Sequence, residues 1–73
     1  MNLYLTELQE DKIYKQVNDI FEKQEGECTN CESNYIFDER NYFNMMTEEN
    51  SFSVEFNTKK GKLLKRSLII KKL

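Results

Sequence analysis

The spacing of apolar residues changes once along this chain, and that change constrains the fold more than any other feature. Before residue 25, apolar side chains recur three or four positions apart, as at Ile13, Val17, Ile20 and Phe21. From residue 34 onward they tend to alternate, most clearly between Phe52 and Phe56. The first spacing is typical of a helix with one buried stripe, and the second of strands with one buried face. We therefore expect one helix followed by a sheet.

The helix is predicted to span about residues 7–24. Thr6 and Gln9 have capping-box spacing, in which the Thr side chain accepts a backbone N–H and the Gln side chain reaches back to the cap. Lys23 lies in the last turn, where the helix dipole favours a cation, and Gly26 suits the position just beyond the end. These signals define both ends of the helix.

The remainder is predicted to be a Cys-x-x-Cys loop over 25–33 and then a β-meander over about 34–73. Turns are expected at 38–41 and 47–50, and a hairpin connection at 57–61, where a glycine can adopt positive φ. The last segment, 62–73, fits a strand or a helix, and its Ile69-Ile70 pair favours a strand.

As a strand, segment 62–73 is predicted to place Leu64, Leu68 and Ile70 on one face, with Leu63, Ile69 and Leu73 on the other. The expected fold is α+β: one N-terminal helix packed on a small three- to four-stranded antiparallel β-meander. The helix stripe should cover the sheet face that carries Phe52, Val54 and Phe56.

Length and composition argue against catalysis. Seventy-three residues permit one domain with a modest core and little room for an enclosed active site. The chain has no His for acid–base chemistry near neutral pH and no glycine-rich phosphate loop. We expect no enzyme and no catalytic residue. No apolar run is long enough to span a bilayer and no signal peptide is visible, so a cytoplasmic location is expected.

The amino-acid composition indicates the kind of genome that encodes this chain. Residues encoded by GC-rich codons are scarce, while Asn and Lys are abundant. This bias is typical of an AT-rich genome, such as that of a low-GC bacterium or one of its phages. A phage protein would act in the cytoplasm of its host cell.

Cys28-Thr29-Asn30-Cys31 is the one motif with a recognised chemistry. Two thiolates at this spacing can share a metal ion, but structural zinc requires four ligands and the chain has no further Cys. Zinc could be shared across a homodimer, or completed by the carboxylates of Glu27, Glu32 or Asp38. Two ordinary loop thiols with no cofactor, or a local disulfide, are the other readings. The flanking Glu residues should raise the thiol pKa, which disfavours redox catalysis.

The charge is strongly divided along the chain. Residues 1–55 contain thirteen acidic and four basic residues, a net charge of −9. Residues 56–73 contain seven basic residues and no acid. Folding of the basic segment against the acidic body would neutralise part of both. Only the charge that folding leaves unpaired can recruit a partner.

The favoured function is a small non-catalytic interaction module that binds and regulates or inhibits another protein. An acidic surface of this kind could occupy a basic groove of nucleic-acid-handling machinery, and charge complementarity would select the partner. The predicted contact residues are the helix acids and the turn acids: Glu7, Glu10, Asp11, Asp19, Glu22, Asp38, Glu39, Glu48 and Glu49.

The alternative is a nucleic-acid-binding regulatory protein that uses the basic C-terminal hairpin, with a zinc-linked dimer as one form of it. Its cations could neutralise phosphates, although no aromatic ring follows Phe56 to stack on bases. The residues that would make these contacts are Lys59, Lys60, Lys62, Lys65, Arg66, Lys71 and Lys72.

Overall fold

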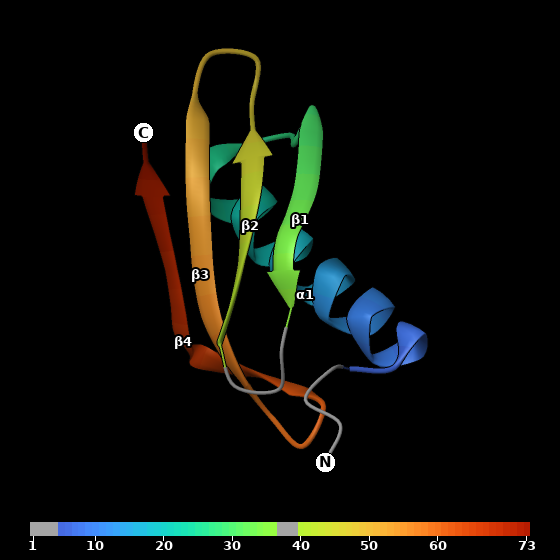
Figure 1. Ribbon diagram of the computed structural model, residues 1–73. Helices are drawn as coiled ribbons and strands as arrows, with labels where there is room; N and C mark the ends of the chain where they lie inside the picture. Colours follow the sequence, from blue (N-terminus) through green and yellow to red (C-terminus); the bar gives the residue numbers. More distant parts are fainter. Residues whose placement is uncertain (1–4, 37–39) are drawn as a thin grey trace.

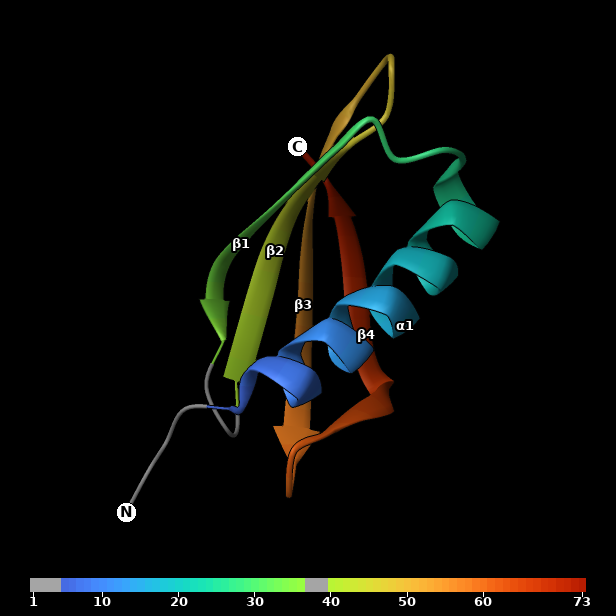
Figure 2. The same ribbon diagram turned by 90° about the vertical axis from the view of Figure 1, so that its right-hand side faces the viewer.

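One helix lies across one face of a four-stranded antiparallel sheet. The computed structural model describes residues 5–36 and 40–73. Helix α1 (Glu7–Glu25) is followed by strands β1 (Asn30–Ile36), β2 (Arg40–Met46), β3 (Ser51–Lys59) and β4 (Lys62–Lys72). The strands pair in chain order, as a meander. In the part of the chain that the structure describes, α1 covers one face of the sheet and the other face is open (Figures 1 and 2). The predicted α+β class is confirmed, with four strands.

Local chemistry fixes both ends of α1. The Thr6 N–H donates to Gln9 Oε1 at 2.9 Å, and the Gln9 N–H donates to Thr6 Oγ1 at 3.2 Å, so the capping box is complete. At the other end Gly26 has φ 109°, and its N–H donates to the Glu22 carbonyl at 3.1 Å. The predicted bounds are thus confirmed to within one residue. Neither α1 nor any other described segment forms a helix long and apolar enough to cross a membrane.

The core is a single layer between α1 and the sheet. Ile13, Val17 and Phe21 of α1 are almost completely buried, as expected from their spacing. The Phe21 ring meets Phe52 of β3 edge-on, with centroids 5.1 Å apart. The prediction that the helix stripe packs on the face carrying Phe52 is confirmed. Among the side chains that the structure describes, the buried core consists of Leu5, Ile13, Val17, Phe21, Phe43, Met45, Phe52, Val54 and Phe56.

The predicted loop 25–33 was too long, because β1 begins at Asn30. Only one face of this sheet is covered by α1, so an edge strand such as β1 needs apolar side chains on that face alone. The polar run around Cys31 therefore lacks the apolar alternation that predicts a strand. Cys31 pairs with Met45 of β2, and the Thr29 N–H donates to the Met46 carbonyl at 2.8 Å just before the strand. The polar sequence therefore follows one edge of the sheet.

Of the three predicted connections, one is confirmed, one is shorter than predicted, and one lies partly outside the described residues. At 38–41 the structure assigns Arg40 and Asn41 to β2, while Asp38 and Glu39 lie outside the described residues. The turn at 47–50 is confirmed: it joins β2 to β3, and the Thr47 N–H donates to the Asn50 carbonyl at 3.0 Å. The connection at 57–61 is shorter than predicted, because β3 continues to Lys59.

Segment 62–73 forms β4, which confirms the preference for a strand, but the predicted faces were wrong. Leu63 packs on the core together with Leu68 and Ile70, whereas Leu64 does not. The cause is a bulge in β4. Glu55 pairs with Ile69 and Asn57 pairs with Leu64, so one residue on β3 lies opposite four residues on β4. Three extra residues are an odd number, so they reverse the alternation of faces along the strand.

A two-residue turn connects β3 and β4. Lys60 has φ 53° and Gly61 has φ 76°, the pair of positive values that a type I′ hairpin turn requires. The predicted positive φ of the glycine is confirmed. Lys60 also occupies the left-handed region, where Asn and Gly are far more common than Lys.

Replacing Lys60 with Asn should therefore stabilise the hairpin. We expect the free energy of unfolding to rise by roughly 0.5–1 kcal/mol, because Asn reaches the left-handed region at lower cost. Lys59→Asn is the matched control, since it removes the same charge from an extended strand position. Urea denaturation of both variants measures the difference. Equal stabilities would contradict the type I′ assignment.

Candidate functional site

Acidic side chains gather at the end of the sheet where α1 ends and β2 turns into β3. A shallow pocket of about 390 Å³ lies there, and we call it the acidic pocket. Its carboxylates come from two connections that are far apart in the sequence, the end of α1 and the turn at 47–50 (Figure 1). Its lining residues are Glu25, Glu27, Thr29, Thr47, Glu48, Glu49 and Asn50.

The predicted helix acids do not line this pocket. At 100° per residue, Glu7, Asp11, Glu22 and Asp19 fall within one arc of about 120° on the exposed side of α1. The Glu22 carboxylate is occupied in part, because its Oε2 accepts the Cys28 N–H at 3.0 Å. Of the predicted protein-binding residues that the structure describes, only Glu48 and Glu49 line the acidic pocket.

A second pocket, of about 400 Å³, lies between the first half of α1 and the β3–β4 hairpin. We call it the basic pocket, because it brings together Lys12 of α1 with Lys60 and Lys62 of the hairpin. The hairpin and the turn at 47–50 close opposite ends of the sheet (Figures 1 and 2), in a molecule whose longest dimension is 41 Å. The basic pocket is lined by Gln9, Lys12, Ile13, Gln16, Lys60, Gly61, Lys62 and Leu63.

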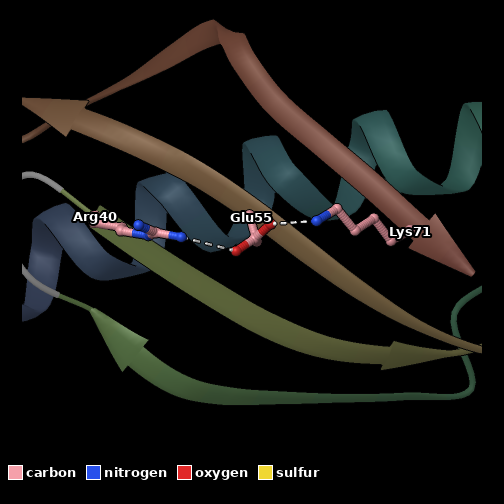
Figure 3. A network of polar contacts seen from close by, with 3 residues as sticks. All are labelled: Arg40, Glu55 and Lys71. Carbon is pink, nitrogen blue, oxygen red and sulfur yellow. Dashed lines mark hydrogen bonds and ion pairs between the residues drawn. The ribbon is translucent and has the colours of Figure 1, made fainter. Parts of the chain in front are cut away.

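The other predicted basic residues do not join this pocket. Lys71 lies on the open face of the sheet, where its Nζ is 3.2 Å from Glu55 Oε2, and Arg40 Nη2 is 3.3 Å from Glu55 Oε1 (Figure 3). Hydrogen bonds from Lys71 and Arg40 hold the pKa of Glu55 below its usual value. Lys72 is at the end of β4 away from the hairpin, and Lys65 and Arg66 lie in the bulge.

Charge neutralisation within the fold is thus limited. Among residues 5–36 and 40–73, both ion pairs involve Glu55, and Lys71 is the one cation of segment 56–73 that takes part. The carboxylates of the acidic pocket and the ammonium groups of the basic pocket have no ion pair with any described residue. Folding therefore separates the two signs of charge instead of pairing them.

The two cysteines lie on the helix side of the sheet, half-buried against the core. Both are free thiols. The Cys28 Sγ donates to the Asn30 carbonyl at 3.1 Å. Burial raises the pKa of the nearby Tyr14 hydroxyl, and Cys31, Cys28 and Glu22 each raise it further, which shows that these four groups are neighbours. Tyr14 was not recognised from the sequence as part of this cluster.

Burial raises the pKa of the Cys31 thiol to about 11, and the adjacent Cys28 adds to the increase. The direction agrees with the sequence-based expectation, but the cause is burial and Cys28 rather than the flanking Glu27 and Glu32. A thiol with this pKa is almost entirely protonated at neutral pH, so it is a poor nucleophile.

Alkylation of Cys31 should therefore be slow in the folded protein. At pH 8 we expect a rate on the order of a hundredfold below that of the urea-unfolded chain, whose thiols have a pKa of about 8.5. Because the folded pKa is raised, the rate should keep increasing as the pH approaches about 11. Iodoacetamide labelling followed by peptide mass spectrometry measures this. An apparent pKa below about 8.5 would instead support a thiol redox enzyme.

Within the described part of one chain, the cysteine pair is not joined by further metal ligands. Among the described residues, no group of three or more Cys, Asp or Glu side chains is placed to hold a metal ion. Completion by Glu27 or Glu32 is therefore not supported, and Asp38 is outside the described residues. Zinc shared between two chains stays a prediction, and native mass spectrometry would report both the mass of a dimer and its metal.

Apart from Glu25, which is a helix acid, and Glu27, which was considered only as a zinc ligand, several residues that build the two pockets were not predicted to contact a ligand. Glu25 and Glu27 complete the acidic pocket, and Gln9, Lys12 and Gln16 form the α1 side of the basic pocket. One signal was present in the sequence: Gln9, Lys12 and Gln16 are three and four positions apart, so they share a helix flank. Spacing alone could not show that this flank faces the β3–β4 hairpin.

No protein-family model, no curated protein and no solved structure shows a significant match to this chain. The two pockets and the cysteine pair are therefore interpreted from their own chemistry.

Proposed function

We propose that this protein is a non-catalytic interaction module that binds a cationic surface of another protein through its acidic pocket. The observation that carries the proposal is the clustering of Glu25, Glu27, Glu48 and Glu49, which converge from two separate connections. Like charges held close together repel and oppose folding. A partner that supplies cations would relieve this repulsion on binding.

The pocket favours Arg and Lys side chains as its ligands. Arg forms bidentate hydrogen bonds with carboxylates, and paired charges across an interface increase the association rate and select the partner. Thr29, Thr47 and Asn50 add neutral polar groups to the same lining. Proteins that handle nucleic acids carry clustered Arg and Lys, so they are the partner class that this chemistry fits, and occupation of such a surface would inhibit them.

The test uses a nine-residue polyarginine peptide as a defined probe of the pocket. Binding is measured by calorimetry at 150 mM salt for the wild type and for the variant E25Q/E27Q/E48Q/E49Q. The matched control is E7Q/D11N/D19N/E32Q, which removes the same charge at exposed positions outside the pocket. We expect at least a tenfold loss of affinity in the pocket variant and less than a twofold loss in the control.

Equal losses in the two variants would overturn the proposal, because binding would then follow net charge alone. Absence of measurable binding by the wild type would overturn it as well. Far-UV circular dichroism of both variants confirms that the comparison is made between folded proteins.

A further inference from the structure

The basic pocket has the composition of an anion site. Its polar lining consists of the ammonium groups of Lys12, Lys60 and Lys62 and the side-chain amides of Gln9 and Gln16. No carboxylate is among the lining residues. Three positive charges and two amide groups that can donate hydrogen bonds therefore surround a space of about 400 Å³.

The lysines of this pocket are not neutralised by the fold. Lys12, Lys60 and Lys62 form no ion pair with the residues at 5–36 and 40–73. The two ion pairs in that part of the chain are at Glu55, on the opposite face of the sheet (Figure 3). A bound anion would offset the mutual repulsion of the three ammonium groups.

Gln9 is held so that its amide nitrogen, not its oxygen, is available to the pocket. Its Oε1 accepts the Thr6 N–H at 2.9 Å as part of the capping box. Its Nε2 consequently lies against Gly61, where a Cβ atom would overlap it. The glycine leaves room for this donor, and the capping box fixes the donor's orientation. Helix start and hairpin turn thus meet at one wall of the pocket.

We propose that the basic pocket binds a phosphoryl group. Phosphate oxygens carry concentrated negative charge and accept several hydrogen bonds, which matches a set of lysine point charges with amide donors. The group could belong to a small polyphosphate or to the backbone of a single-stranded nucleic acid. This site is separate from the acidic pocket, so the two proposals succeed or fail independently.

The test is a nitrogen-15 NMR titration with sodium pyrophosphate at 150 mM salt. Binding in the pocket should shift the Gly61 backbone amide and the side-chain amides of Gln9 and Gln16. The variant K12Q/K60N/K62Q should lose at least tenfold in affinity, and Asn at position 60 keeps the hairpin turn favourable. The matched control K15Q/K23Q/K72Q removes the same charge elsewhere and should lose less than twofold.

A second titration, with decathymidylate, identifies the source of the phosphoryl group. Competition with pyrophosphate, together with the same loss in the pocket variant, would assign the site to a nucleic-acid backbone. Binding of pyrophosphate alone would assign it to a small phosphate. The proposal is overturned if pyrophosphate does not bind, if both triple variants lose affinity equally, or if the shifts do not centre on the pocket.

Discussion

Replacing Phe43 with alanine should leave most of the protein unfolded at 25 °C. Phe43 is completely buried on β2, and its ring centroid lies 5.2 Å from that of Phe56 and 6.0 Å from that of Tyr14. Truncation of such a ring typically costs about 3–5 kcal/mol, from lost burial and from the cavity that remains. One hydrophobic core in a chain this short rarely supplies more than about 3–5 kcal/mol, so the loss consumes nearly all of it.

Near-ultraviolet circular dichroism and the dispersion of the proton NMR spectrum measure the outcome. Asn44→Ala is the control, because Asn44 is the next residue of β2 and is exposed on the other face. Its effect should stay within about 0.5 kcal/mol. If Phe43→Ala unfolded cooperatively with a free energy within about 1 kcal/mol of the wild type, the layer between α1 and the sheet would not be the source of stability.

Replacing Gly61 with alanine should have the second-largest effect, a loss of about 2–3 kcal/mol. Two terms contribute. The residue has φ 76°, which a side chain destabilises, and the new methyl group would overlap the Gln9 amide. Moving Gln9 away removes its half of the capping box, so a change in a hairpin turn would weaken the start of α1. Urea denaturation measures the total.

A double-mutant cycle with Gln9→Ala separates the two terms. If the overlap matters, Gly61→Ala should be about 1 kcal/mol less damaging in a chain that already lacks the Gln9 side chain. Gly26→Ala gives an upper limit for the backbone cost alone, because nothing lies within 4 Å of its added Cβ, while its φ of 109° and ψ of −172° are less accessible to a side chain than the left-handed conformation of Gly61. Strict additivity of Gly61→Ala and Gln9→Ala would show that Gln9 moves aside without loss.

The parts of the fold that follow from local chemistry were predictable from the sequence. The capping box of Thr6 and Gln9 is a contact over three positions, and its geometry is implied by the two residue types. The alternation of Phe52, Val54 and Phe56 required a face for these side chains to share, and the helix stripe was the one apolar surface available. Periodicity therefore determined α1, β3 and the packing between them.

The errors arose where a distant contact decides the local structure. The bulge in β4 is held by Ser67, whose hydroxyl accepts the Asn57 N–H at 2.8 Å and donates to the Leu64 carbonyl at 2.6 Å. Nothing in the pattern of residues 62–73 indicates this bond to another strand. The strand was consequently identified correctly while Leu63 and Leu64 were assigned to the wrong faces.

The candidate sites were predictable only in part, for a related reason. The sequence shows which segments are acidic or basic, but a pocket forms where the fold brings connections together. Glu48 and Glu49 meet Glu25 and Glu27 because α1 ends beside the turn between β2 and β3. Lys12 joins Lys60 and Lys62 because the opposite end of α1 reaches the hairpin. Spatial grouping of charge depends on topology.

The bulge in β4 also determines which deletions the chain can tolerate. Removing Lys65 and Arg66 would leave one extra residue opposite β3, so Leu68 and Ile70 would still point into the core. Removing Ser67 as well would make the pairing regular, with Leu68 opposite Phe56 and Ile70 still opposite Val54, so both side chains would again face the core. The bulge can therefore lose up to three residues without changing which side chains of the flanking pairs face the core, because opposite residues of antiparallel strands share a face.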